Sequence, residues 1–560
     1  MLLKKIISTL AFIIFSGQVY ADNWRPNQVG AFLSSKIARS ITDIENSAYF
    51  AEYSYNRNPD SFALGAIALE ALIANGQITE ALPIGLKVSK DMPEITLAQY
   101  LSLIDHLNSN ANDKVLETLL KVSPNGIDNF ILPILQTWAA AATNKESGGI
   151  EIMRAQANRG VLEPLYDYHI ALIYEFKGDI ENAYLFYKNI INRSNNANAH
   201  VYSRAAIFFA NNNYTELYNE TLIKLEKIDP YSNELFILKN NNSYSRKNNV
   251  SNIRDGIAEV FLNSAEILFN EGLDRQALIY AQISSYLAPN SDSSYYLLGR
   301  IFKSINNNER ALKYFKKVNE YSLVTHDANI AYAETIYDLK GLDSSTQFLN
   351  NIKNSFPDNI NYLRTMAELF YKADNFKKSI EYYDLIFKKI EKIEFKHWPL
   401  FYSSGIALER GKNWERAEKQ FLTALQFVPN NPQVLNYLGY SWIDKGININ
   451  EALEMIVNAA EQRPDDGYII DSLGWAYYQI GKYEDAVINL EKAVELVSDS
   501  VIIDHLGDAL FFSGRKIEAV FQWKRALEFN ASDELKNILN NKINGDSLPK
   551  PGVNAVSKPI

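Results

Sequence analysis

The chain has 560 residues, of which 47% are hydrophobic and 22% are charged, so it is globular rather than disordered or fibrous. Its formal charge of -10 argues against binding to nucleic acid or to anionic lipid, because both attract basic proteins. The sequence contains no cysteine, which excludes disulfides, thiolate zinc sites, iron–sulfur clusters and a cysteine nucleophile.

The first 21 residues have the features of a cleaved secretory signal. Lys4 and Lys5 precede a mostly apolar run over residues 6–15, and residues 19–21 read Val-Tyr-Ala. Small residues at the third and first positions before the cut suit signal peptidase, so we expect cleavage after Ala21. The apolar run is shorter than the roughly 20 residues that span a bilayer, although an uncleaved anchor is the alternative. We expect an exported chain with no transmembrane segment after signal cleavage.

A spacing of about 34 residues recurs through the rest of the chain. Each copy has an anchor residue, often a Leu-Gly pair, with a small residue twelve positions on, a large one sixteen on and another small one nineteen on. From Gly474 these offsets reach Ala486, Leu490 and Ala493. The anchors are Ser35, Leu69, Ala171, Ala206, Ala265, Gly299, Ala333, Ala367, Gly405, Gly439, Gly474 and Gly507, with weaker ones near Leu103 and Ala139.

This pattern resembles the tetratricopeptide repeat, in which each copy is a pair of antiparallel helices. The resemblance implies an all-α fold, a right-handed α-solenoid of about fourteen hairpins over most of residues 30–540. We expect the small residues at the anchor and at offset twelve to lie where the two helices cross. The large residue at offset sixteen should fill the gap to the next copy. Prolines such as Pro59, Pro93, Pro289, Pro357 and Pro429 should end the second helices.

The repeat spacing fails once, between Ala206 and Ala265, which are 59 residues apart. The excess is polar and rich in asparagine, so we expect a loop over residues 231–252 between blocks 22–230 and 253–543. A local insertion in one continuous solenoid is the alternative. We expect a capping helix over 532–543 and a flexible tail over 544–560, where three prolines occur.

The sequence offers no recognisable catalytic constellation. The six histidines lack the helical spacing of a metal site, and the stretch from Gly405 to Lys412 has the wrong spacing for a phosphate loop. Repeat residues leave no block of about 100 residues for a separate catalytic domain. We therefore predict a protein that is not an enzyme and uses no cofactor or metal.

Stacked hairpins leave a concave surface lined by the first helix of each copy. Positions six and three before the anchor, and one and four after it, should face this groove. In the C-terminal copies these positions combine aromatic rings, which dominate interface energetics, with acids but no basic clamp. The predicted partner-binding groove comprises Arg364, Tyr371, Asn436, Tyr440, Asp471, Trp475, Tyr478, Asp504, Asp508 and Phe511.

Residues 463–478 and 504–508 resemble the C-terminal block of long periplasmic repeat proteins of proteobacteria. The resemblance implies a periplasmic scaffold that binds a partner protein or extended peptide. Some relatives are lipoprotein adaptors of a carboxy-terminal-processing protease, but this chain lacks their anchoring cysteine. The alternative is a structural part of envelope assembly or polysaccharide export machinery. A repeat-flanked glycosyltransferase is a third class, disfavoured because no non-repeat block is present.

Overall fold

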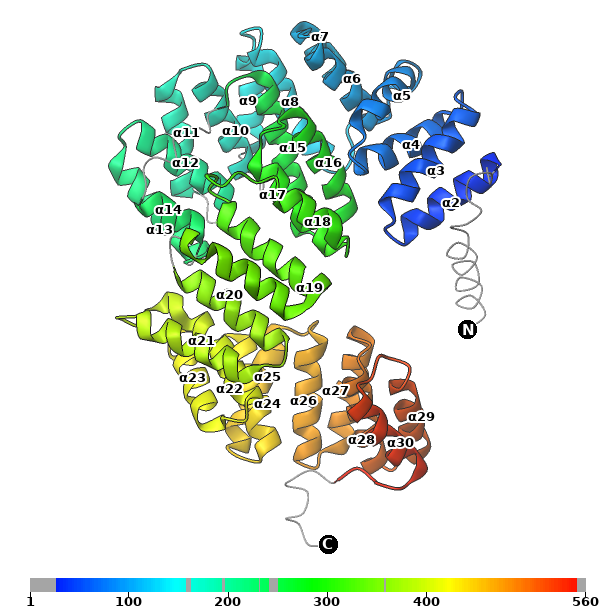
Figure 1. Cartoon of the computed structure of the whole chain (residues 1–560), viewed down its shortest axis with the longest axis vertical. Coiled ribbons are helices and arrows are strands. Elements are labelled where there is room, and N and C mark those ends of the chain that lie inside the picture. Colours follow the sequence, from blue (N-terminus) through cyan, green and yellow to red (C-terminus); the bar gives the residue numbers. More distant parts are fainter. Residues whose placement is uncertain are drawn as a thin grey trace. The chain divides into compact units, whose positions relative to one another are not determined.

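The computed structural model describes residues 27–157, 163–193, 197–230, 232–240, 250–356 and 359–550 (Figure 1). In these ranges the regular structure is entirely helical, with twenty-nine α-helices and two short 3-10 helices. The helices up to the polar insertion are α2 (Gln28–Ser40), α3 (Ile44–Arg57), α4 (Phe62–Ala74), α5 (Ile78–Asp91), α6 (Thr96–Asn108), α7 (Asn112–Leu119), α8 (Asp128–Ala141), α9 (Ser147–Ala157), α10 (Glu163–Phe176), α11 (Ile180–Arg193), α12 (Ala199–Asn211), α13 (Thr215–Ile228) and α14 (Asn233–Asn240).

The remaining helices continue the pairing. They are α15 (Ile253–Asn270), α16 (Asp274–Leu287), α17 (Asp292–Ser304), α18 (Asn308–Phe315), α19 (Thr325–Ile352), α20 (Asn359–Lys372), α21 (Phe376–Lys389), α22 (Trp398–Arg410), α23 (Trp414–Phe427), α24 (Pro432–Lys445), α25 (Ile449–Gln462), α26 (Gly467–Gln479), α27 (Tyr483–Leu496), α28 (Ser500–Phe512), α29 (Lys516–Ala526) and α30 (Asp533–Asn544), with η3 (Lys353–Ser355) and η4 (Phe395–His397). Helix α19 is itself a hairpin, because its backbone turns at Gly341. The predicted all-α repeat fold is confirmed.

Small residues bring the two helices of each hairpin together, as predicted. The Ser35 hydroxyl donates to the Ser47 carbonyl oxygen, twelve residues on, at 3.0 Å. A Cβ added to Gly474 would lie 2.5 Å from Leu490, and one added to Gly405 would lie 2.6 Å from Phe421. The large residue at offset sixteen therefore packs on the anchor of its own copy. Phe421 also contacts the next copy, since its ring lies 5.2 Å from that of Tyr437.

One copy has its second helix displaced by a residue. In the copy anchored at Gly439, an added Cβ would meet the Ala452 carbonyl oxygen and Ile456 Cγ1, both at 2.9 Å. These residues lie thirteen and seventeen positions after the anchor. The extra residue is absorbed in the preceding turn, where Gly446 and Asn448 adopt positive φ angles.

Four of the predicted closing prolines lie directly after second helices, and Pro357 lies outside the described residues. Pro59, Pro93, Pro289 and Pro429 each stand two residues beyond the end of α3, α5, α16 and α23. Proline lacks an N–H and restricts the residue before it, so the helix stops there.

The structure corrects the predicted boundaries. The expected loop over 231–252 is wrong at residues 233–240, because α14 forms there and buries Leu235, Ile237 and Leu238. Residues 241–249 lie outside the described residues, as do the predicted signal over 1–21 and the end of the tail. The chain divides into two compact units at residues 365 and 366, not at the polar insertion. We call them the first unit and the second unit.

In the first unit, the hairpin α15–α16 packs against helices far away in sequence as well as against its neighbours. The hydroxyls of Tyr100 and Tyr280 both donate to Asp128 Oδ1 at 2.6 Å. Arg275 Nε donates to Glu70 Oε1 at 2.9 Å. These contacts place the hairpin against α4, α6 and α8, so the inner faces of these repeats are covered rather than open.

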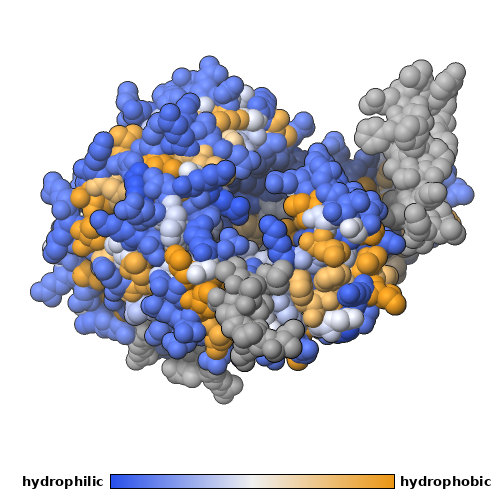
Figure 2. All heavy atoms as spheres, turned by 90° about the horizontal axis from the view of Figure 1, so that it is seen from below, coloured by the Kyte–Doolittle hydropathy of each residue, from blue (hydrophilic) through white to orange (hydrophobic). Residues whose placement is uncertain are grey.

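The predicted capping helix is present as α30. In the described part of the chain, no helix is both long enough and apolar enough to cross a bilayer. The face drawn in Figure 2 carries hydrophobic residues in separate patches between hydrophilic ones. Scattered exposure of this kind is ordinary for folded proteins, so it does not by itself mark a site.

Candidate functional site

The inner faces of α26 and α28 hold a cluster of aromatic and acidic side chains. His505 Nδ1 lies 2.9 Å from Asp471 Oδ1, and the Trp475 ring stacks on His505 with centroids 4.1 Å apart. Burial alone would lower the pKa of His505, but Asp471 and the nearby Asp504 and Asp508 outweigh it and raise the pKa. The imidazole therefore offsets the charge of Asp471.

The capping helix supplies a cation to this cluster. Lys542 Nζ lies 2.7 Å from Asp504 Oδ1 and 2.7 Å from Asp508 Oδ1, and the three side chains are about nine-tenths buried. Trp523 Nε1 also donates to Asp508, at 3.1 Å. Burial and the adjacent Asp504 raise the pKa of Asp508 to about 6, against the opposing effect of Lys542.

Aromatic rings continue from this cluster toward the last repeat. Trp475 and Tyr478 stack with centroids 4.8 Å apart, and Trp475 remains partly exposed. The Tyr478 hydroxyl donates to the backbone oxygen of Lys550, so the described part of the tail crosses α26. Phe511 is half-buried beside Trp523, with ring centroids 6.0 Å apart.

The earlier repeats of the second unit extend the set of rings. Tyr371, Tyr402, Tyr437 and Tyr440 are all half-buried and come from α20, α22 and α24. The rings of Tyr402 and Tyr437 meet edge to face at 6.1 Å. Burial and Tyr371 raise the pKa of Tyr402 to about 12. Burial raises the pKa of Tyr440, and the carboxylates of Asp444 and Asp471 raise it further. Tyr440 therefore lies near the acidic cluster.

The structure thus brings five predicted residues into one cluster: Asp471, Trp475, Tyr478, Asp504 and Asp508. Asn436, Tyr440, Tyr371 and Phe511 are half-buried on the same series of first helices, and Asn436 Oδ1 is buried without a partner among the described residues. Arg364 belongs to the first unit.

Sequence analysis missed Lys542. Lys542 lies outside the repeat positions. The sequence feature that pointed to a buried cation was the acidic pair Asp504 and Asp508, which are one helical turn apart.

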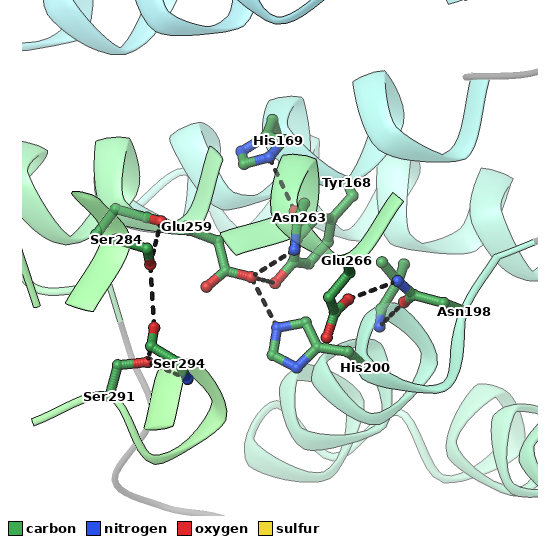
Figure 3. A network of polar contacts seen from close by, with 12 residues as sticks. Tyr168, His169, Asn198, His200, Glu259, Asn263, Glu266, Ser284, Ser291 and Ser294 are labelled. Carbon is green, nitrogen blue, oxygen red and sulfur yellow. Dashed lines mark hydrogen bonds and ion pairs between the residues drawn. The ribbon is translucent and has the colours of Figure 1, made fainter. Parts of the chain in front are cut away.

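In the first unit, the inner faces of α10 and α12 meet α15 through a polar network centred on Glu259 (Figure 3). Tyr168 donates to Glu259 Oε1 at 2.8 Å, and His200 Nε2 lies 2.7 Å from the same oxygen. His169 connects two other groups: its Nδ1 accepts from Trp138 Nε1 at 3.2 Å, and its Nε2 lies 3.1 Å from Asn263 Oδ1.

The two histidines of this network have opposite electrostatic environments. Burial alone would lower the pKa of His200, but Glu259 raises it to about 9. Burial lowers the pKa of His169 to about 4, although Glu259 opposes this shift. At neutral pH, His200 therefore carries a charge that pairs with Glu259, while His169 is neutral and donates its proton to Asn263.

Comparison with known proteins agrees with the repeat pattern. The family model described as "Tetratricopeptide repeat" matches residues 292–323 and 470–498. The TPR repeat-containing protein PA4667 of Pseudomonas aeruginosa is 26% identical over 212 residues, which cover 36% of this chain and 34% of that protein. The match therefore spans about a third of the relative's length.

Among solved structures, one chain of the APC/C heterotetramer Cut9–Hcn1 aligns with a TM-score of 0.32 and 14% identity. The alignment covers 81% of the present chain and 96% of the chain in that structure. A tetratricopeptide repeat protein from Parabacteroides merdae aligns with a TM-score of 0.32 and 16% identity. This alignment covers 50% of the present chain and 97% of the Parabacteroides chain.

Proposed function

Because the chain is a tetratricopeptide repeat protein, we propose that it is a non-catalytic scaffold that holds an extended segment of a partner protein. The proposed surface is the set of inner helices of the second unit. The observation that carries the proposal is the series of half-buried rings on successive first helices, from Tyr371 through Tyr402 and Tyr440 to Trp475 and Phe511.

The chemistry of this surface favours rings over acids as the source of affinity. Asp504 and Asp508 already share an ion pair with Lys542, and Asp471 lies against His505. A basic partner would have to displace these ion pairs. Partly exposed rings can bury large areas at little cost in side-chain entropy, so they supply binding energy without rearrangement.

The test compares proteins retained by the purified chain with those retained by Trp475→Ala and Tyr440→Ala. Phe521→Ala is the matched control, because Phe521 is a 65% exposed ring on α29, a second helix outside the proposed surface. We expect a partner that the wild type and Phe521→Ala retain and that both inner-face variants lose. Retention of the same proteins by all four forms would contradict the proposal, provided that circular-dichroism melts show the variants folded.

We further propose that the scaffold acts in the periplasm as an adaptor for an envelope protease. This proposal follows from the signal-like first 21 residues and from the similarity to periplasmic repeat proteins. Mass spectrometry of proteins that co-purify from the periplasm tests it. A retained protease supports the adaptor role, whereas retained export machinery would replace it with envelope assembly. A nucleotide-sugar-dependent activity of the pure chain would overturn both.

A further inference from the structure

The first unit contains a cavity of about 540 Å³ beside the Glu259 network, a size within the roughly 300–1,000 Å³ of small-molecule sites. Its walls come from α10, α12, α14, the first half of α15, the turn between α16 and α17, and the turn before α19. All of these elements belong to the first unit, so the cavity is a feature of that unit alone.

The walls of the cavity are rich in groups that can both donate and accept hydrogen bonds. Among the described residues, six serines and two asparagines line it, together with four carboxyl-bearing side chains, one arginine and one histidine. Two of the carboxylates already hold the walls together. Asp292 Oδ1 accepts from the backbone N–H of Asn319 at 2.8 Å, and Asp255 Oδ2 accepts from the Ser251 hydroxyl at 2.6 Å.

Arg204 supplies a buried donor without an acceptor. Its side chain is 7% exposed, and its Nη2 donates to Glu175 Oε1 at 3.0 Å. The other terminal nitrogen, Nη1, is buried and has no hydrogen-bond partner among the described residues. Because an unpaired N–H of a buried guanidinium is costly, an acceptor oxygen is expected beside it.

Glu259 supplies the matching acceptor. All three hydrogen bonds that it makes with described residues use Oε1, to which Tyr168, His200 and Asn263 turn. Figure 3 shows its second oxygen turned away from His200. Arg204 on α12 and Glu259 on α15 both line the cavity, so its walls offer a donor that lacks an acceptor and an acceptor that lacks a donor.

We propose that this cavity binds an uncharged sugar through its hydroxyl groups. A hydroxyl group accepts from a guanidinium and donates to a carboxylate, so one kind of group serves both Arg204 and Glu259. An anion would face four carboxyl-bearing side chains, and a cation would face the Arg204 guanidinium. Ile207, Leu262 and Leu323 provide apolar contact for the C–H groups of a sugar ring.

The protonation of Glu234, another lining side chain, agrees with an uncharged ligand. Burial raises the pKa of Glu234 to about 7. At neutral pH a large fraction of this carboxyl therefore keeps its proton, which lowers the negative charge of the walls. A protonated carboxyl can also donate to a hydroxyl group as well as accept from one.

Saturation-transfer NMR of the full chain tests the cavity. The uncharged probes are glucose, galactose and N-acetylglucosamine, and the charged probes are glucosamine and glucuronate. We expect saturable binding of at least one uncharged sugar and weaker binding of both charged ones. Binding of none of the three uncharged sugars would overturn the proposal and leave water as the partner of Arg204 Nη1. Tighter binding of either charged sugar would overturn it as well, because charge would then dominate recognition.

Two variants test whether the sugar lies in the cavity. Arg204→Lys keeps a positive charge beside Glu175 and removes the nitrogen that lacks an acceptor, so affinity should fall about tenfold. Ser293→Phe fills the cavity from its α17 wall and should abolish binding, whereas Ser147→Phe, at the exposed start of α9, is the matched control and should not change it. Melting curves check that the variants fold. Unchanged affinity in either folded cavity variant would overturn the proposal, and Ser293→Phe decides it alone if Arg204→Lys does not fold.

Disaccharides distinguish the two sources of such a ligand, a free monosaccharide and the end residue of a glycan chain. Maltose, lactose and diacetylchitobiose end in glucose, galactose and N-acetylglucosamine. Binding of the disaccharide at least as tight as that of its end sugar assigns the cavity to a glycan chain, and weaker binding assigns it to the free monosaccharide. The site does not depend on the partner-binding surface proposed for the second unit.

Discussion

Gly256 on α15 packs directly against the Trp138 ring of α8. A Cβ added there would lie 2.4 Å from Cε3 of Trp138, a fully buried side chain. A larger side chain at this position would force the buried Trp138 ring or the backbone to shift. The glycine therefore contributes to the close packing of α15 on α8.

Gly256→Ala should destabilise the protein by about 1–3 kcal/mol, because an extra methyl group overpacks a dense core. Gly148→Ala is the matched control, since an added Cβ at Gly148 meets nothing within 4 Å. The control should be neutral or slightly stabilising, because alanine suits a helix better than glycine. Urea unfolding of the three forms checks this. Equal stabilities for Gly256→Ala and the wild type would contradict the close approach.

The His200–Glu259 pair makes stability depend on pH in the alkaline range. The folded pKa of about 9 lies above the unfolded value of about 6.5, so the pair stabilises the fold fully below pH 6.5. That contribution is lost as the pH rises through 9. The free energy of unfolding should therefore fall as the pH rises, and we expect His200→Gln to remove this part of the fall. Urea unfolding at pH 6.5 and pH 9 measures it. An equal fall in the free energy of unfolding between pH 6.5 and pH 9 in wild type and variant would contradict this role of the pair.

At the scale of elements, α30 is more than a polar cap on the last hairpin. It inserts Lys542 between Asp504 and Asp508 of α28, and the Lys542 Nζ also lies 5.8 Å from the centre of the Trp523 ring. An apolar cap would leave two buried carboxylates next to each other without a counterion. The helix therefore closes the solenoid through charge as well as through apolar contact.

Lys542→Gln should cost roughly 3 kcal/mol, because removal of one partner leaves buried charge uncompensated. The loss should be smaller at pH 5 than at pH 8, since the raised pKa of Asp508, about 6, allows that carboxyl to become neutral. Lys536→Gln on the same helix is the control. Its partner Asp533 has a 96% exposed side chain, so solvent screens the pair and the loss of stability should be much smaller than for Lys542→Gln. Thermal melts at both pH values measure the difference. Equal losses for the two variants would contradict a stabilising role for the buried lysine.

At the scale of the whole molecule, the two compact units are both built from helical hairpins but differ in whether the inner faces of those hairpins are covered. In the second unit, the acidic cluster and the half-buried rings lie on consecutive first helices. In the first unit, the corresponding faces of α4, α8 and α10 are covered by α15 and α16. A solenoid in which each repeat touches only its neighbours would leave both sets of faces open. The rings proposed as a partner-binding surface therefore lie on the second unit, whereas the corresponding faces of the first unit are covered.

The signal-like segment leads to a prediction about the whole chain. If the segment is cleaved after Ala21, the mature protein begins at Asp22. Intact-mass spectrometry of the protein expressed in a bacterial host, with N-terminal sequencing, checks this. A chain that retains residues 1–21 in the membrane fraction would favour the uncleaved anchor instead.

Much of the fold could be predicted from the sequence because hairpin packing is local. The small residues at the anchors and at offset twelve determine where paired helices cross, as Ser35 and Ser47 show, and prolines such as Pro429 determine where second helices end. The displacement in the copy at Gly439 is also visible in the sequence, because Ala452 lies thirteen rather than twelve residues after the anchor.

The tertiary structure alone decided which inner faces are covered and which acids are neutralised. Asp128 and Tyr280 are 152 residues apart, a separation over which the repeat period carries no pairing information. Lys542 lies on the capping helix α30, outside the repeat positions, so the repeat pattern does not predict its contact with Asp504. The asparagine-rich composition of the polar insertion predicts a loop, although Leu235, Ile237 and Leu238 give α14 a short apolar face. Periodicity specifies contacts between neighbouring helices, whereas contacts between distant repeats depend on how small rotations accumulate along the chain.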